Sequence, residues 1–310
     1  MTIDVIIDHH KIIERAALVE GRSLWTDAYR RLLRNRAAVI SMTILALLVL
    51  VAGLVPLAWP YSYAQTDFGL VNCAPNWFPA GAYCNAGAMH ILGTDAVGRD
   101  LFVRVLYGAR VSLSVGFAAT VVSLIIGVGY GAVAGYFGGR IDELMMRFVD
   151  ILYSLPYIFL VIILMVVFNR NFLLLFVAIG AVEWLTMSRI VRGQTLSLKQ
   201  KEFVEAARAA GLGPLMIIRR HIVPNVLGPV IVYVTLTIPS VILAESFLSF
   251  LGLGIQEPLT SWGVLIYEGA NQMETAPWML AFPALLMAVT LFSFNFIGDG
   301  LRDALDPKDR

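Results

Sequence analysis

The chain has 310 residues, of which 58% are hydrophobic and only 15% are charged, and its mean hydropathy is +0.76. A soluble domain would carry nearer a quarter of charged residues, so the composition excludes an ordinary soluble globular protein. The formal net charge of +1 gives no indication of a strongly charged partner such as nucleic acid. The class indicated is an all-α, polytopic membrane protein.

Long apolar runs predict six transmembrane helices, because a helix needs about 20 apolar residues to cross the hydrocarbon core. The predicted spans cover residues 37–59, 111–139, 151–168, 171–190, 222–252 and 275–298. The fourth is interrupted by Glu183, but without it the basic segment that follows would face outside. No secretory signal is expected, since the first apolar run is too long and follows a polar tail, residues 1–36. The remaining residues, 37–310, are expected to form one transmembrane domain.

The distribution of Lys and Arg predicts the topology. If the tail lies inside, all of the 23 basic residues except four fall in inner segments, which is the positive-inside pattern. Both termini and the loop 200–224 are therefore expected to be cytoplasmic, and residues 60–109 form a large outer loop. Another outer segment contains Glu257, Glu268 and Glu274 but no basic residue. This predicts an acidic rim, which faces either a partner protein or solvent.

The only two cysteines, Cys73 and Cys84, both lie in the predicted outer loop. Bacterial outer compartments are oxidising, and no third cysteine competes, so a disulfide between them is predicted. Two free thiols are the alternative. The same loop ends near Thr94 and Asp95, either of which can cap a helix that continues into the second span.

Four glycines at intervals of four residues lie in the second span: Gly127, Gly131, Gly135 and Gly139. At helical spacing they share one face, and they allow another backbone to approach closely. The seam is either packing within this chain or an interface at a pore or with another subunit. Proline residues in the third and sixth spans, among them Pro156 and Pro283, predict bends.

The most informative segment covers residues 202–225 and reads EFVEAARAAGLGPLMIIRRHIVPN. Its first residues are strong helix formers, and Gly211 is expected to end that helix because glycine adopts a left-handed conformation without penalty. Pro214 suits the first turn of a second helix, and Pro224 is expected to stop it. The sequence therefore predicts two short helices joined by a glycine.

This segment resembles the EAA loop of permease subunits in binding-protein-dependent ABC importers. The matching residues are Glu205, Ala206, Ala207, Gly211 and Pro224, with Arg208 beside them. Further stretches resemble the C-type subunit of dipeptide, oligopeptide and nickel permeases, and they are residues 93–100 (GTDAVGRD), 107–113 (YGARVSL), 135–139 (GYFGG), 244–254 (AESFLSFLGLG) and 298–307 (GDGLRDALDP). The resemblance covers nearly the whole chain.

The resemblance implies a type I ABC importer permease in a bacterial inner membrane. It implies as partners a homologous second permease, two ATPase subunits that dock on the EAA loop, and an extracytoplasmic substrate-binding protein. Di- or oligopeptides are the implied cargo, and nickel, glutathione or another peptide-like solute are alternatives. A secondary transporter would have similar hydropathy, but no inverted repeat is visible.

No enzymatic activity, cofactor or metal is expected. A P-loop needs Gly-Lys followed by Ser or Thr, and no lysine here follows a glycine, so ATP must be bound by another chain. Neither HExxH nor GxSxG occurs. Two acidic residues within predicted spans, Glu183 and Glu245, are candidates for the translocation path because a charge in lipid is costly. The alternatives are a pairing of Glu183 with Arg189 or with another helix, and a structural role for Glu245.

Overall fold

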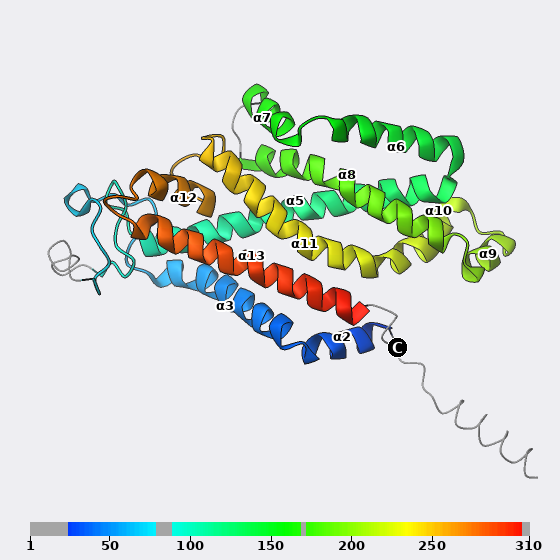
Figure 1. Ribbon diagram of the computed structural model, residues 1–310, viewed down its shortest axis with the longest axis horizontal. Helices are drawn as coiled ribbons and strands as arrows, with labels where there is room; N and C mark the ends of the chain where they lie inside the picture. Colours follow the sequence, from blue (N-terminus) through cyan, green and yellow to red (C-terminus); the bar gives the residue numbers. More distant parts are fainter. Residues whose placement is uncertain (1–23, 79–88, 169–171, 306–310) are drawn as a thin grey trace, which may run out of the picture.

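The computed structural model describes residues 24–78, 89–168 and 172–305. Within these ranges the regular structure is helical and contains no named strand, so the predicted all-α class is confirmed (Figure 1). The helices are α2 (Leu24–Arg34), α3 (Arg36–Ala58), α5 (Leu101–Phe137), α6 (Gly139–Ser154), α7 (Tyr157–Val167), α8 (Phe172–Leu198), α9 (Glu202–Ala209), α10 (Pro214–Ile217), α11 (Val223–Phe250), α12 (Trp262–Asn271) and α13 (Trp278–Leu305), with a 3-10 turn η1 (Phe68–Leu70) and a π-helical segment η2 (Ile218–Ile222).

Four helical stretches of the described chain are long and apolar enough to cross a membrane: Arg36–Ala58, Leu101–Phe137, Pro214–Phe250 and Trp278–Leu305. Helices α6 and α7 together make a fifth, bent by 81°. By this measure the predicted number of six is not reached, because α8 is not among the stretches that qualify.

The packing of α5 and α8 nevertheless shows that α6 and α7 return along the length of the bundle. Residues that face each other across the contact come in the same order along both helices. Gly127 of α5 faces Met187 of α8, and Gly135 faces Thr195. The two helices are therefore parallel, as Figure 1 shows. The chain between the end of α5 and the start of α8 must return across the molecule, and α6 and α7 make that passage.

The bend between α6 and α7 corrects the prediction of one continuous third span over residues 151–168. Pro156 lies at the N-cap of α7, directly after the last residues of α6. Proline has no N–H to donate and its ring collides with the preceding helical turn, so an uninterrupted helix is disfavoured here. The predicted bend at Pro156 is thus a complete break.

Helix α5 begins ten residues before the predicted start of the second span at residue 111. Its N-cap is Asp100, whose carboxylate accepts a hydrogen bond from the Val103 N–H at 2.8 Å. Neither Thr94 nor Asp95 is the cap, so that prediction was wrong. With 37 residues, α5 is about 55 Å long, well beyond the roughly 30 Å of a hydrocarbon core.

The packing of α3 against α5 includes a backbone group that a proline leaves unpaired. Pro56 lies inside α3 and cannot donate to the carbonyl of Ala52, four residues earlier. The guanidinium of Arg110, on α5, donates to that carbonyl and to the carbonyl of Gly53. An arginine that the sequence places among apolar residues therefore satisfies carbonyls of a neighbouring helix.

Candidate coupling loop and polar clusters

The loop 200–224, which we call the coupling loop, contains a helix that ends at a glycine. Gly211 has a φ of +81°, and no atom would lie within 4 Å of a Cβ there. The Gly211 N–H donates to the carbonyl of Arg208 at 3.0 Å, and the Leu212 N–H donates to that of Ala207 at 3.1 Å. These two bonds form a Schellman motif, which satisfies the last carbonyls of α9 and reverses the chain.

The second helix of the loop continues into the membrane helix, which corrects the expectation that Pro224 would stop it. Pro214 lies in the first turn of α10, and the helix then runs through η2 directly into α11. In η2 the Val223 N–H bonds to the carbonyl of Ile218, five residues earlier. This wider turn gives the ring of Pro224 room at the start of α11, so the helix is not interrupted.

The inner face of the coupling loop is part of a hydrophobic cluster, and its outer face is open. Val204 and Ala207 are buried together with Ile217. Ala207 therefore attaches the loop to the helix bundle and cannot contact a partner. The other residues matched to the EAA pattern are exposed, namely Glu205, Ala206, Arg208, Gly211 and Pro224. Beside them lie exposed apolar side chains, Phe203, Leu215 and Met216.

Three of the four glycines in the predicted ladder face α8. A Cβ on Gly127 would lie 2.6 Å from the Met187 side chain, and one on Gly135 would lie 2.8 Å from the carbonyl oxygen of Arg192. Gly131 is equally close to α8. Gly139 is not part of this seam. It begins α6 with a φ of +52° and open space around it, because α5 ends before Gly138 and the chain turns there.

The two acidic candidates for the translocation path lie in different surroundings. Glu245 is fully buried, and its carboxylate accepts hydrogen bonds from the hydroxyls of Ser249 at 2.7 Å, Ser261 at 2.6 Å and Ser112 at 3.4 Å. These serines come from α11, the N-cap of α12, and α5. Glu245 therefore joins three elements and faces no open space. Glu183 is half-buried on α8.

The expected Glu183–Arg189 pair is not formed. Arg189 instead donates to Asp150, on α6, at 2.7 Å, and its guanidinium also lies 4.3 Å from the centre of the Tyr153 ring. The reason is geometric, because residues six apart on a helix point in different directions, whereas α6 lies alongside.

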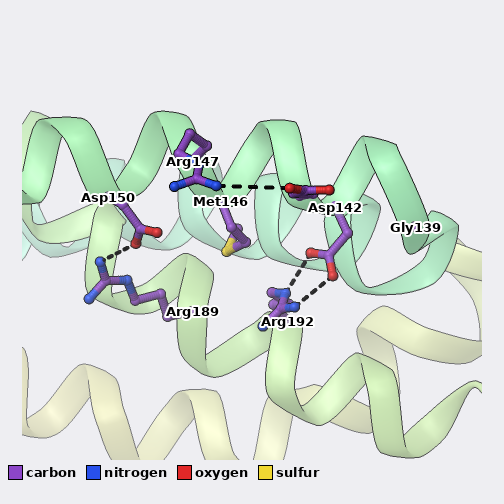
Figure 2. Close-up of a pocket in the computed structure, with 8 residues that line it drawn as sticks. Gly139, Asp142, Met146, Arg147, Asp150, Arg189 and Arg192 are labelled. Carbon is purple, nitrogen blue, oxygen red and sulfur yellow. Dashed lines mark hydrogen bonds and ion pairs between the residues drawn. The ribbon is translucent and has the colours of Figure 1, made fainter.

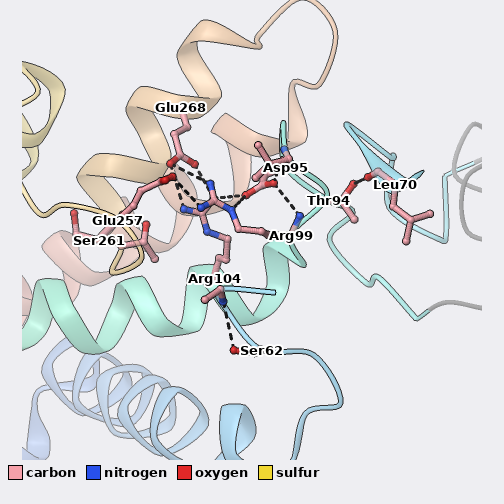
Figure 3. Close-up of polar contacts among 12 residues, drawn as sticks. Ser62, Leu70, Thr94, Asp95, Arg99, Arg104, Glu257, Ser261 and Glu268 are labelled. Carbon is pink, nitrogen blue, oxygen red and sulfur yellow. Dashed lines mark hydrogen bonds and ion pairs between the residues drawn. The ribbon is translucent and has the colours of Figure 1, made fainter. Parts of the chain in front are cut away.

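A cluster of ion pairs, shown in Figure 3, lies where α5 begins, at the end of the bundle that the basic residues predict to be outer. This outer cluster consists of Asp95, Arg99, Arg104, Glu257 and Glu268. Arg104 is fully buried and pairs with both Asp95 and Glu268, the latter at 2.7 Å. Arg99 donates to Asp95 at 2.6 Å and to Glu257 at 2.9 Å. The cluster joins α12 to the start of α5.

The outer cluster corrects the prediction of an acidic rim. Burial lowers the pKa of Arg99, but the charge of Asp95 and the hydrogen bonds to Asp95 and Glu257 raise it more, so the pKa lies above its ordinary value. Two of the three glutamates expected at the rim are therefore paired with arginines. Of the three, the paired Glu257 keeps a side chain that is 66% exposed, and Glu274 is exposed as well.

The predicted disulfide involves a residue outside the described ranges. Cys73 is fully buried and disulfide-bonded. Cys84, the partner that we predicted, lies outside the described residues. The Cys73 N–H donates to the hydroxyl of Thr94 at 2.8 Å, and its carbonyl accepts from the Thr94 N–H at 2.9 Å. The bonded cysteine is thus attached to the segment that leads into α5.

A recess of about 540 Å³ is lined by residues of α6 and α8 (Figure 2). Figure 1 shows that α6 begins at the end of the bundle where α5 stops. The charged residues that line this recess are three acids and three arginines: Asp142, Glu143, Asp150, Arg147, Arg189 and Arg192. No sequence pattern had pointed to this site. Glu143, Arg147 and Asp150 of α6 follow one another at intervals of four and three residues, which could have predicted one polar helical face.

Comparison with known proteins decides the family. Residues 127–310 match the family described as binding-protein-dependent transport system inner membrane component, and residues 23–75 match the N-terminal transmembrane domain of oligopeptide transport permease C. The chain belongs to this family of ABC importer permeases. As such a permease, it is a multi-pass protein of a bacterial inner membrane.

Curated relatives match this permease over nearly its whole length. The oligopeptide transport system permease protein OppC of Escherichia coli K12 is 57% identical over 292 residues, which are 94% of each chain. OppC of Haemophilus influenzae is 55% identical, with 94% of this chain and 91% of that one covered. The dipeptide transport system permease protein DppC of Bacillus subtilis is 45% identical over 92% of this chain and 86% of its own.

A solved structure supports the permease fold. An inward-facing conformation of the MetNI methionine ABC transporter contains a chain that matches with a TM-score of 0.54 and 20% identity. The match covers 66% of this permease and 96% of that chain. At this identity the likeness concerns the fold alone.

Proposed function

We propose that this permease translocates di- or oligopeptides and is driven by separate ATPase subunits that dock on the coupling loop. The observation that carries the coupling role is the exposed outer face of that loop, built on a glycine-terminated helix and attached to the bundle by its buried inner face. The names of the relatives at 45–57% identity support peptides as cargo. Nickel or glutathione import by the same machinery is the alternative.

The proposed docking face combines apolar and charged side chains. Phe203, Leu215 and Met216 are 40%, 72% and 49% exposed, and small alanines beside them allow a partner surface to approach closely. Glu205 and Arg208 supply charges at the edge of the face. An exposed apolar patch with a polar rim is typical of a protein interface. The surface therefore suits a subunit that binds ATP, which this chain cannot do itself.

The proposed mechanism is alternating access within an assembly of two permeases, two ATPases and an extracytoplasmic binding protein. Closure of the ATPase dimer displaces the coupling loop, for which the positive-inside pattern predicts a cytoplasmic position, as it does for both termini. The displacement moves the helices to which the loop is packed. Substrate then enters from the binding protein, and release of the nucleotide products returns the pore to its inward-facing state.

A pair of glycine variants tests the coupling role. Gly211 and Gly213 are both exposed with open space around them, but only Gly211 has a positive φ. A β-branched residue is strongly disfavoured at positive φ, so Gly211→Val should distort the loop, whereas Gly213→Val should not. We expect the wild type and Gly213→Val to co-purify with two ATPases and a second permease, and Gly211→Val to lose the ATPases.

Equal recovery of ATPases by both variants would contradict the coupling role. A wild type that purifies alone and transports without ATP would make a secondary transporter the leading explanation. The cargo is tested separately in proteoliposomes that contain the assembly and its binding protein. We expect ATP-dependent uptake of a labelled tripeptide that excess unlabelled tripeptide suppresses and excess nickel or glutathione does not.

A further inference from the structure

The recess between α6 and α8 is lined by exposed charged side chains. The side chains of Glu143, Arg147 and Asp150 are 73%, 70% and 59% exposed. A charged side chain that faces lipid is costly, so residues of this kind in a membrane protein face water or other protein. The recess therefore faces water or a partner chain, and not lipid, at the end of the bundle where the coupling loop lies.

The charges of the recess differ in how firmly they are paired. Asp142 and Arg192 form the floor, with two hydrogen bonds of 2.5 and 2.6 Å that fix both groups. At the rim, Arg147 and Glu143 approach to only 3.9 Å, too far for a hydrogen bond. Figure 2 shows Arg147 on α6 above the floor formed by Asp142 and Arg192. Arg147 and Glu143 thus keep their capacity to bind a charged ligand.

We propose that this recess binds a zwitterionic solute through its ammonium and carboxylate groups. This inference rests on the proposed peptide function, since a peptide with free termini is such a solute. The volume of about 540 Å³ falls within the 300–1,000 Å³ that is usual for small-molecule sites. Three acids and three arginines make the recess neutral overall, so it favours a ligand that carries both charges over an anion or a cation.

The geometry assigns a role to each rim group. A carboxylate of the ligand accepts hydrogen bonds from Arg147 and Arg189. Of these two, Arg189 is already oriented by Asp150 and by the Tyr153 ring. The ammonium donates to Glu143 and to the exposed oxygen of Asp150. The floor pair keeps α6 and α8 at a fixed separation and is not displaced.

Binding of trialanine to the whole assembly, measured by saturation-transfer NMR without the binding protein, tests the proposal. The assembly is held in nanodiscs of phosphatidylglycerol alone, so that no phospholipid ammonium competes. N-acetyl-trialanine amide, which lacks both terminal charges, is the comparison ligand. We expect the capped peptide to bind about fivefold to tenfold more weakly than trialanine, as expected when partly exposed charge pairs are lost.

The variant Glu143→Gln/Arg147→Gln should bind trialanine as weakly as the capped peptide. Arg302→Gln/Asp303→Asn removes one charge of each sign from the exposed end of α13 and should bind like the wild type. The reversed pair Glu143→Arg/Arg147→Glu keeps both charges and should retain most of the binding. Equal binding of free and capped peptide, or undiminished binding by the rim variant, would overturn the proposal.

ATP-dependent uptake of trialanine by the same wild-type assembly with its binding protein separates the two proposals. Uptake without charge-dependent binding at the recess rejects only the zwitterion site. Binding at the recess without uptake of any peptide rejects the proposed transport function and leaves the site itself supported.

Discussion

The glycine seam between α5 and α8 allows a sharp test, because α5 also carries a glycine outside the seam. A Cβ at Gly135 would lie 2.7 Å from the Cβ of Thr195 and 2.8 Å from the carbonyl oxygen of Arg192. Ordinary carbon contacts are about 3.5–4.0 Å, so Gly135→Ala must separate the helices by roughly 1 Å. Gly129 is exposed and has nothing within 4 Å of a Cβ.

The two substitutions change helix propensity equally, by about 1 kcal/mol in favour of alanine, so their difference isolates the packing cost. Overpacking of this kind costs about 1–3 kcal/mol, and we expect Gly135→Ala to be less stable than Gly129→Ala by that amount. Unfolding of the purified permease by SDS, followed by circular dichroism in detergent, measures both. If the two variants unfold at the same SDS fraction, α5 and α8 are not in close backbone contact and the parallel arrangement derived from it fails.

Three other changes have expected outcomes in the same unfolding assay. Arg104→Gln removes the fully buried cation between Asp95 and Glu268, which then have only Arg99 as a charged partner, and should destabilise by about 3–5 kcal/mol. The exposed Arg147→Gln should cost about 0–1 kcal/mol. Arg110→Met leaves the Ala52 carbonyl unpaired and should destabilise the protein by about 1–3 kcal/mol. The loss should be much smaller in a Pro56→Ala background, where the N–H of residue 56 can donate to that carbonyl. An equal loss in both backgrounds would exclude the Arg110–Ala52 hydrogen bond. Glu245→Gln should destabilise the protein less than Glu245→Ala. Only alanine leaves all three serine hydroxyls without an acceptor and also creates a cavity beside them. Equal losses of stability would show that the hydroxyls find other partners.

Features that depend on residues near one another in sequence were predictable. The spacing of Gly127, Gly131 and Gly135 indicated one helical face, and the structure places that face against α8. The composition indicated an all-α membrane protein. Gly211 was expected to end a helix, and it has the required positive φ. In each case the physical cause, a helical period or a backbone preference, acts within a few residues.

Features that depend on distant partners were not predictable. Residues 101–110 did not resemble a membrane helix, because the charges of Arg104 and Arg110 are balanced by Glu268 and by carbonyls of α3. The pairs between the outer arginines and Glu257 or Glu268 join positions 158 and 164 residues apart, so the glutamates looked unpaired in sequence. The π-helical turn before Pro224 likewise depends on how the whole helix packs, which no local pattern reveals.

Helix α5 is the element that connects the coupling loop to the outer end of the bundle. Its residues Val128 and Ala132 belong to the same buried cluster as Ala207 of the loop, and the guanidinium of Arg208 lies 5.9 Å from the centre of the Tyr136 ring on α5, so the loop also reaches α5 directly. At its other end Arg104 ties α5 to α12 through Glu268. The helix is continuous between these points and has no internal proline, so it cannot absorb a displacement by bending at a kink. We therefore expect a displacement of the coupling loop to reach the opposite end of the bundle as a joint movement of α5 and α12.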